Sequence, residues 1–259
     1  MIGILDSGFG GLSIYQSVTA LLPHESTVYI GDHAYLPYST KSQSVIHGRV
    51  KKLIQFLLTK HAKLIVIACN TATVAGIDTY RRWFPEIPIV GVVPVIKTAA
   101  AVTKTKKIIV LSTLFTAKSV YQKKLIRQFG GECCVYNIGC SDLVLLVEQG
   151  IFHGEEVTKE LLTILTPFVR KGADVIALGC THFPFLKDQI RAIVGEDIAI
   201  LDSGGAVARH VARIVEQNHI QASGRRGGHT FYSTRKWPGA TGIATTLLQK
   251  NVHVGYAAI

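Results

Sequence analysis

The stretch Ile65-Val66-Ile67-Ala68-Cys69-Asn70-Thr71-Ala72-Thr73 is an apolar run that stops at a cysteine and small polar residues. A short uncharged run rich in Ile and Val is typical of a parallel strand that is covered on both faces. Thr71 or Thr73 can cap a helix that follows this strand. Ligands bind at the carboxyl ends of the strands in open α/β sheets, so the pattern predicts that Cys69 lies at a ligand-binding edge.

A second stretch has the same layout. Residues 175–182 read Val-Ile-Ala-Leu-Gly-Cys-Thr-His, and Cys180 follows Cys69 by 111 residues. Two more pairs of apolar segments keep the same order, at offsets of 111 and 106 residues: 87–90 with 198–201, and 2–6 with 108–112. Any two buried strands look alike, but three pairs in one order favour a duplicated unit.

The predicted elements alternate between strands and helices, which indicates an α/β fold. We expect two similar doubly wound domains with mainly parallel sheets, related by a pseudo-two-fold axis, with the active site in the cleft between them. The first domain is predicted to comprise residues 1–95 and 206–259, and the second residues 96–205. A predicted helix over residues 206–217 returns the chain to the first domain.

The composition is that of an ordinary globular protein. The chain has 259 residues, and 48% of them are hydrophobic, which is enough for a full core without metal or disulfide support. No segment approaches the roughly 18 uncharged apolar residues of a membrane span. The N-terminus lacks the basic lead of a secretory signal, so we expect a cytoplasmic protein without a membrane partner.

The formal net charge is +11. Most basic residues are dispersed, and some form short pairs: 51–52, 81–82, 106–107, 123–124 and 225–226. No recognisable nucleic-acid-binding motif joins these pairs. A basic binding module is the non-enzyme alternative, but a basic surface alone predicts only non-specific, salt-sensitive binding to nucleic acid.

The five cysteines, at positions 69, 133, 134, 140 and 180, do not indicate a disulfide framework or a metal site. Their number is odd, and reduced thiols are the natural state in the cytoplasm. Cys133, Cys134 and Cys140 lack C-x-x-C spacing, and the ten histidines are scattered. We therefore predict no bound metal.

The first predicted strand ends at Asp6, and the glycine-rich residues 7–11 allow a sharp turn into a helix over residues 12–22. The turn is not the G-x-G-x-x-G pattern of dinucleotide-binding proteins, because position 13 is Ser. It also lacks the Gly-Lys-Ser/Thr of a P-loop. No cofactor is therefore expected. Asp6 is either a helix cap or a group on the same rim as Cys69.

Two further segments are candidates for the site. Residues 31–40 form a polar and aromatic loop after the predicted strand 27–30, and such loops commonly line sites. Glu148 follows the apolar residues 143–147. This glutamate is either at a solvated helix end, which is the commoner case, or directed into a cleft.

The predicted positions of Cys69 and Cys180 indicate what kind of reaction the site can perform. Each is predicted at a strand end before a helix, where free N–H groups and the helix dipole lower the pKa of a thiol from its usual value of about 8.5. If the duplicated domains face each other, Cys69 and Cys180 lie on opposite sides of one cleft. This geometry suits a reaction that needs a base on one face of a carbon atom and an acid on the other.

Inversion at the α-carbon of an amino acid is such a reaction. One thiolate removes the proton, and the opposite thiol returns a proton to the other face. Small polar residues and two helix starts can hold carboxylates and spread the developing charge; the polar residues are Ser7, Asn70, Thr71 and Thr181. Asp6 and His182 can tune the neighbouring cysteines or relay their protons.

Seven short segments, in order along nearly the whole chain, are highly specific in combination: Asp6-Ser7-Gly8-Phe9-Gly10-Gly11, Gly31-Asp32, Pro37-Tyr38, Ala68-Cys69-Asn70-Thr71-Ala72, Val147-Glu148-Gln149-Gly150, Gly179-Cys180-Thr181-His182-Phe183-Pro184 and Asp202-Ser203-Gly204. Together they resemble the glutamate racemases of the aspartate/glutamate racemase superfamily. The resemblance implies a cofactor-independent racemase with two similar α/β domains around its substrate. It also implies that the product, D-glutamate, supplies peptidoglycan synthesis.

Residue roles follow from the resemblance position by position. Cys69 and Cys180 are implied as the paired acid and base, assisted by three further residues: Asp6, Glu148 and His182. The implied substrate-binding residues are Asp6, Ser7, Tyr38, Ser39, Asn70, Thr71, Thr181 and His182. A homodimer is left open.

Two positions depart from the family pattern. Ser39 stands where the family usually has Gly after Pro-Tyr, so a close backbone contact there is altered. Ser141 follows Cys140 where the family usually has Pro, which affects local backbone more than chemistry. His182 stands where aspartate racemases of the superfamily carry an acid, and this favours glutamate as the substrate.

A cysteine hydrolase is the competing enzyme class. Cys180 and His182 could serve as its nucleophile and base. This alternative leaves Cys69 without a role.

Overall fold

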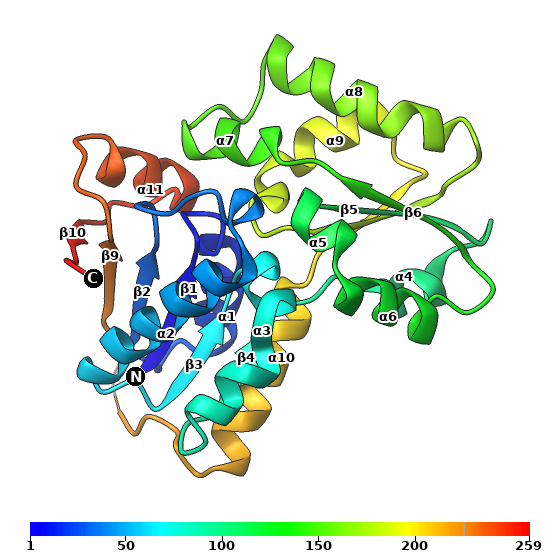
Figure 1. Ribbon diagram of the computed structural model, residues 1–259. Helices are drawn as coiled ribbons and strands as arrows, with labels where there is room; N and C mark the ends of the chain where they lie inside the picture. Colours follow the sequence, from blue (N-terminus) through cyan, green and yellow to red (C-terminus); the bar gives the residue numbers. More distant parts are fainter. Residues whose placement is uncertain (225) are drawn as a thin grey trace.

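The computed structural model describes residues 1–224 and 226–259, so Arg225, half of one basic pair, lies outside the described residues. The chain forms two lobes, each built on its own sheet (Figure 1). The strand orders are β10-β9-β2-β1-β3-β4 and β6-β5-β7-β8. Every strand pairing in the described parts of these sheets is parallel. The predicted α/β class with two parallel sheets is confirmed.

The first sheet takes strands from both ends of the chain. They are β1 Ile2–Asp6, β2 Thr27–Gly31, β3 Leu64–Ile67, β4 Ile89–Gly91, β9 His229–Ser233 and β10 Val254–Tyr256. Its α-helices are α1 Leu12–Leu21, α2 Gln43–Thr59, α3 Asn70–Trp83, α10 Gly204–Gln217 and α11 Ala240–Leu248, and Tyr38–Thr40 forms the short 3-10 helix η1.

The second sheet is smaller and continuous in sequence. Its strands are β5 Lys107–Ser112, β6 Cys134–Gly139, β7 Val175–Gly179 and β8 Ala199–Leu201. Its helices are α4 Ile96–Val102, α5 Leu114–Lys118, α6 Val120–Phe129, α7 Asp142–Glu148, α8 Glu155–Val169 and α9 Lys187–Val194, and Phe183–Leu186 forms the 3-10 helix η2.

The two sheets repeat the same four-strand unit. The order β2-β1-β3-β4 in the first sheet corresponds to β6-β5-β7-β8 in the second. The register corresponds as well, because Leu5 pairs with Ile67 and Leu111 pairs with Leu178. These pairs follow the segment matches of the sequence, so the structure supports the inferred duplication.

Burial on both faces of the first sheet explains the uninterrupted apolar run of β3. Val66 belongs to the cluster of buried side chains on one face, and Ile65 and Ile67 belong to the cluster on the other. Alternate residues of a strand point to opposite faces, so both faces of β3 require apolar residues.

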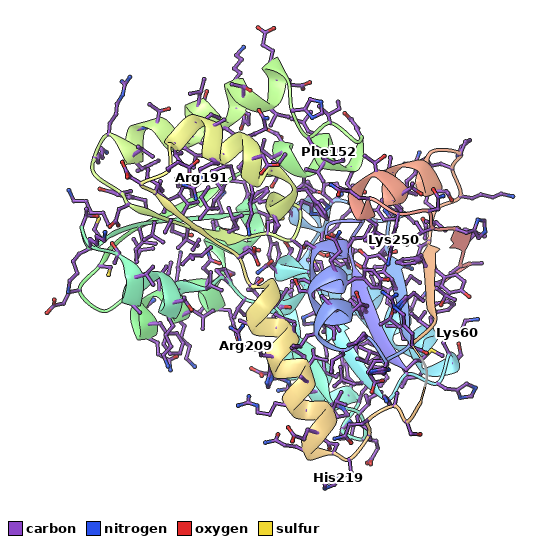
Figure 2. The ribbon with its side chains drawn as sticks, turned by 180° about the vertical axis from the view of Figure 1, so that it is seen from behind. Lys60, Phe152, Arg191, Arg209, His219 and Lys250 are labelled. Atoms are coloured by element: carbon purple, nitrogen blue, oxygen red, sulfur yellow. The ribbon has the colours of Figure 1, made fainter. Side chains whose placement is uncertain are left out.

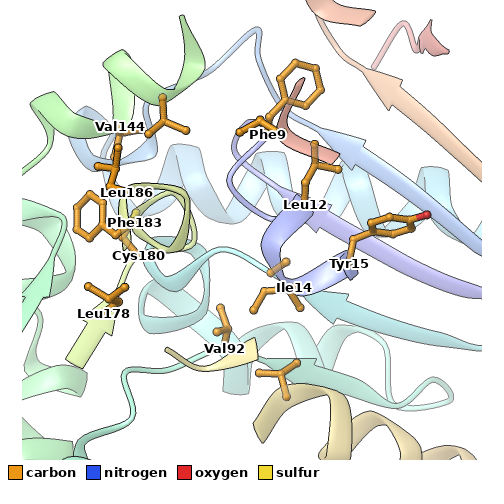
Figure 3. Close-up of a cluster of buried hydrophobic side chains, with 14 of the residues drawn as sticks. Phe9, Leu12, Ile14, Tyr15, Val92, Val144, Leu178, Cys180, Phe183 and Leu186 are labelled. Atoms are coloured by element: carbon orange, nitrogen blue, oxygen red, sulfur yellow. The ribbon is translucent and has the colours of Figure 1, made fainter. Parts of the chain in front are cut away.

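One apolar cluster extends from the first lobe into the second. Figure 3 shows Leu12 and Ile14 of α1 on one side, with Leu178 of β7 and Phe183 of η2 on the other. The same cluster contains Cys180. The lobes therefore share part of their core, and this shared packing brings the end of β7 close to the start of α1.

The chain passes from one sheet to the other after β4 and returns after β8 (Figure 1). On the return, α10 carries Arg209 and runs along the first lobe toward His219, as Figure 2 shows from behind. The domain boundaries at residues 95 and 205 stay a prediction. No helix among the described residues is long and apolar enough to cross a membrane.

Some boundaries differ from the sequence-based expectation. The apolar segment 87–90 contributes to a strand that is limited to Ile89–Gly91. The helix that follows this strand begins at Ile96. Pro88 and Pro94 flank this short strand, and a proline cannot donate a ladder hydrogen bond.

Candidate active site

Cys69 lies directly after β3 and caps the start of α3. Its Sγ accepts a hydrogen bond from the backbone N–H of Ala72 at 3.4 Å. Its thiol is within 3.7 Å of Ser7 Oγ, to which it donates. The side chain is buried, so the strand-end position that the sequence predicted brings Cys69 into an enclosed site.

Asp6 ends β1, the strand next to β3. One carboxylate oxygen accepts from the N–H of Gly8 at 3.0 Å, and the other lies 3.4 Å from Thr181 Oγ1, which donates to it. The side chain is completely buried. Burial raises the pKa of Asp6, although nearby His182 and the Gly8 N–H oppose this change.

The predicted net lowering of the pKa of Cys69 is wrong, although the N–H group at the helix start does act in that direction. Burial raises the pKa of this thiol well above its ordinary value, and the negative charge of Asp6 raises it further. The N–H of Ala72 and the hydroxyl of Ser7 favour the thiolate, but these two interactions do not offset the loss of solvation. Cys69 is therefore held as a neutral thiol.

Cys180 lies directly after β7, in the position that corresponds to Cys69 in the repeat. Its Sγ is 3.6 Å from Nδ1 of His182. The other ring nitrogen of His182 is 2.6 Å from Oε1 of Glu148. Burial disfavours the charged imidazolium, but Cys180 and Glu148 together raise the pKa of His182 well above its ordinary value.

Glu148 ends α7, and its side chain is only 7% exposed, so it is not at a solvated helix end. Its Oε1 also accepts from the N–H of Phe9 at 2.5 Å. Its Oε2 lies 3.3 Å from Nε2 of His33. Burial disfavours the carboxylate, but the two histidines outweigh this effect and hold the pKa of Glu148 well below its usual range.

Two glycines of the β1–α1 turn make room for this arrangement. A Cβ atom at Gly8 would overlap the carboxylate of Glu148, and one at Gly10 would overlap the ring of His182. The turn therefore needs glycine because side chains of the second lobe pack directly against its backbone.

Both thiols line one small cavity. Its lining residues are Ser7, Pro37, Tyr38, Ser39, Cys69, Asn70, Thr71, Thr113, Val144, Cys180, Thr181 and His182. The cavity volume is about 10 Å³, which is room for a single water molecule. Asp6 and Glu148 do not line it and lie behind Cys69 and His182 respectively. The structure thus brings together all the predicted site residues, in two layers.

Several polar atoms at the cavity are ready to bind a ligand. Ser39 Oγ and Asn70 Nδ2 are buried and have no hydrogen-bond partner among the described residues. Thr71 Oγ1 lies 2.9 Å from Thr113 Oγ1. A buried donor without a partner is costly, so these atoms favour a polar occupant.

Tyr38 differs from the others. Its ring lines the cavity, but its hydroxyl donates to the carboxylate of Asp32 at 2.6 Å. Asp32 also forms a buried ion pair with Arg49, with 2.8 Å between Oδ1 and Nη2. The hydroxyl of Tyr38 therefore fixes the loop that carries Ser39.

Two residues of this region, Thr113 and His33, were not predicted from the sequence. Thr113 follows β5 as Ser7 follows β1, so the offset of 106 residues could have identified it. His33 lies in the loop after β2, and no pattern in the sequence distinguishes it from its neighbours.

The remaining cysteines lie outside the site. Cys134 is exposed, Cys133 is half-buried, and Cys140 is buried beside Glu160. No group of three or more His, Cys, Asp or Glu side chains within the described ranges could hold a metal ion.

Comparisons with known proteins agree with this geometry. The family model for Asp/Glu/Hydantoin racemase matches residues 2–211. A glutamate racemase of Cupriavidus pinatubonensis is 39% identical over 262 residues, covering 100% of this chain and 95% of the relative. A glutamate racemase of Pseudomonas paraeruginosa is 38% identical over 233 residues, covering 90% of this chain and 88% of the relative.

Solved structures are similar over nearly the full length. Glutamate racemase of Escherichia coli, in complex with L-glutamate and an activator, gives a TM-score of 0.88 at 32% identity, covering 99% of this chain and 97% of that one. A glutamate racemase isoform of Bacillus anthracis gives 0.89 at 31% identity, covering 100% and 97%. The chain therefore belongs to the glutamate racemases of the Asp/Glu/hydantoin racemase family, and it is an amino-acid racemase.

Proposed function

We propose that this chain interconverts L-glutamate and D-glutamate without a cofactor, by proton transfer between the substrate α-carbon and two cysteines. The observation that carries the proposal is that Cys69 and Cys180, from corresponding strand ends of two lobes, line one cavity. The substrate would lie between the two assigned domains, residues 1–95 with 206–259 and residues 96–205.

On the Cys180 side, His182 is placed to accept the thiol proton. Its Nδ1 faces Sγ, and Glu148 stabilises the imidazolium that forms. The resulting thiolate removes the α-proton of one enantiomer. In the reverse direction, the thiol returns that proton and the imidazolium restores the thiol.

On the Cys69 side, the neutral thiol is suited to donate a proton to the opposite face of the carbanion. The raised pKa of Cys69 keeps it protonated until the carbanion develops. In the reverse direction Asp6, whose own pKa is raised by burial, would have to accept the thiol proton itself, because its negative charge otherwise favours the protonated form of Cys69. Asp6 and His182 therefore serve the two cysteines separately.

Substrate binding would rely on neutral donors. No Lys or Arg is among the residues that line the cavity in the described chain. Hydroxyl, amide and backbone N–H groups would hold the two carboxylates, with contributions from Ser7, Ser39, Asn70, Thr71, Thr181 and His182. The start of α3 adds its free N–H groups on the same side. Tyr38 would contribute its ring.

The same resemblance supports the cellular role. A glutamate racemase of this kind would supply D-glutamate for peptidoglycan synthesis in the cytoplasm. The basic surface would contribute only non-specific attraction to anions, and a homodimer stays a prediction.

Circular dichroism of L-glutamate with purified protein tests the proposal directly. We expect the signal to decay to zero without added cofactor, and to decay equally after exhaustive dialysis against a chelator. D-glutamate should give the mirror-image decay. An unchanged signal from both enantiomers would exclude the function, and activity that is lost on chelation and restored by metal would exclude the cofactor-free mechanism.

A further inference from the structure

His33 is a buried histidine that the mechanism above does not use. It lies two residues after the end of β2 and is 7% exposed. Its ring packs against the rings of Phe9 and Trp237, with centroid distances of 4.2 Å and 4.6 Å. A Cβ atom at Gly31 would overlap the same ring. The packing therefore holds the imidazole in one orientation.

The contacts of the two ring nitrogens indicate where the protons are. Nδ1 lies 3.1 Å from the carbonyl oxygen of Gly31, which can only accept, so Nδ1 carries a proton. Nε2 lies 3.3 Å from Oε2 of Glu148, which is within ion-pair distance but without the alignment of a hydrogen bond. An ionised carboxylate also only accepts, so this approach is attractive only when Nε2 carries a proton as well. The distance between the two groups suits an ion pair in which the imidazole is protonated and the carboxylate is ionised.

Glu148 is thus shared between two histidines. Oε1 faces His182 at 2.6 Å and Oε2 faces His33 at 3.3 Å. Glu148 is the only ion-pair partner of His33 in the described chain, and the other neighbours of the ring are aromatic side chains and a backbone carbonyl. A charge on His33 therefore reduces the attraction that Glu148 exerts on a proton of His182.

We infer that His33 is a positioning residue for the racemisation: it orients Glu148 toward His182, and its charge sets how tightly His182 holds the proton that it receives from Cys180. The inference rests on the proposed function. It concerns the Cys180 side, because the contacts of His33 in the described part of the chain do not include Cys69, Ser7 or Asp6.

The pH profile of kcat/KM provides the first test. In His33→Gln the carboxylate is no longer shared, so the imidazolium of His182 persists to higher pH. We expect the alkaline limb, which reports the coupled His182–Cys180 pair, to move up by about one pH unit. The plateau of kcat/KM should fall by about tenfold, since one pKa unit corresponds to that factor in proton affinity.

A matched control is available in His47. This histidine also contacts a backbone carbonyl, that of Ala75, at 2.7 Å and packs against the rings of Tyr80 and Trp83, away from the cavity. His47→Gln should leave the limb in place. His33→Lys, which keeps a positive charge near Glu148, should restore the limb toward its wild-type position. If His33→Gln does not fold, His33→Asn removes the same charge and is measured in place of His33→Gln.

Isotope effects provide the second test. Enantiomers have equal free energy, so any variant must change kcat/KM for both by the same factor. A defect confined to the Cys180 side nevertheless makes the proton transfer between Cys180 and the substrate α-carbon more rate-limiting. The α-deuterium isotope effect on kcat/KM should therefore rise for the enantiomer that Cys180 deprotonates and fall for the other. General damage would not produce opposite changes.

The outcomes separate the two hypotheses. If wild-type protein does not racemise glutamate, the proposed function fails before His33 is tested. If wild type is active and the uncharged His33 variants show an unmoved limb and unchanged isotope effects, the role of His33 is overturned. A limb that moves equally in His33→Gln and His33→Lys would also overturn it, because charge would not be the cause.

Discussion

The Cys69 and Cys180 sides of the cavity occupy corresponding positions of one repeat but have different chemistry. Cys69 has a carboxylate behind it, Asp6, whereas Cys180 has an imidazole, His182. Each unit lacks the group that the other has. By the offsets of the repeat, Ser112 of the second unit corresponds to Asp6 of the first, and Thr71 of the first unit corresponds to His182 of the second.

The duplication therefore determines where the two thiols lie. Single substitutions beside each thiol determine which of its protonation states is favoured. The negative charge of Asp6 favours the protonated form of Cys69. The imidazole of His182 can hold the proton of Cys180 and pair with its thiolate. The two sides are thus suited to opposite protonation states, which is what a transfer from one face to the other requires.

Removing either thiol should have the largest effect. We expect Cys69→Ala and Cys180→Ala each to lower racemisation by at least about 10² to 10⁴, the usual cost of losing a general base. Cys133→Ala and Cys134→Ala are controls away from the cavity and should stay within a few fold. Circular dichroism of each enantiomer measures the rates, and near-wild-type activity of either first variant would end the two-cysteine assignment.

Changing Glu148→Gln should disturb the Cys180 side alone. The charge that raises the pKa of His182 is lost, so the imidazolium should titrate at lower pH. We expect kcat/KM to fall by about 10- to 100-fold, less than for a direct acid or base, and the alkaline limb of its profile to move down. A limb that moved up would contradict the hydrogen bond from His182 to Glu148 as the cause.

Asp6→Asn should disturb the Cys69 side, where the carboxylate raises the pKa of the thiol. The pKa of Cys69 is raised first by burial and then by Asp6, so removing this charge should lower the pKa and increase the thiolate fraction at a given pH. We expect iodoacetamide to label Cys69 about tenfold faster at alkaline pH, as for a change of one pKa unit. Mass spectrometry of the Cys69 peptide gives the rate, and the exposed Cys134 is the internal control. Equal labelling of Cys69 in wild type and variant would show that burial alone sets its pKa.

The smallest effect is expected at Ser39, which lines the same cavity as the two thiols. Its buried hydroxyl has no partner among the described residues, so it is available to the substrate. Ser39→Gly should raise KM about threefold, the cost of one neutral hydrogen bond, with kcat nearly unchanged. Steady-state kinetics separate the two constants, and a lower KM would mean that the hydroxyl hinders binding.

The sequence was sufficient for the class of fold and for most of the residues that line the cavity. Repetition revealed the strand ends, and small polar residues beside each cysteine identified the lining. The offset of 106 residues also relates Thr113 to Ser7, so the repeat holds the information that would have predicted Thr113. The strand ends and the residues beside each cysteine are local features of the chain, so they can be recognised in a single sequence.

Electrostatics and packing between distant segments could not be predicted in the same way. The pKa of Cys69 depends on how completely the site excludes water, and a helix start is visible in a sequence whereas burial of that extent is not. His33 acquires its role only because α7 brings Glu148 against it, and these residues are more than a hundred positions apart. The orientation of Tyr38 likewise depends on Asp32 and Arg49.

The position of Glu148 between the lobes has a consequence for motion. Glu148 and His182 belong to the second lobe, whereas Phe9 and His33 belong to the first. A cavity of about 10 Å³ must widen before an amino acid enters. Widening that separates α7 from the β1–α1 turn would remove two partners of the carboxylate while leaving His182 attached. His182 would then bind its proton more tightly in the open form, so opening would take up protons and become easier as the pH falls.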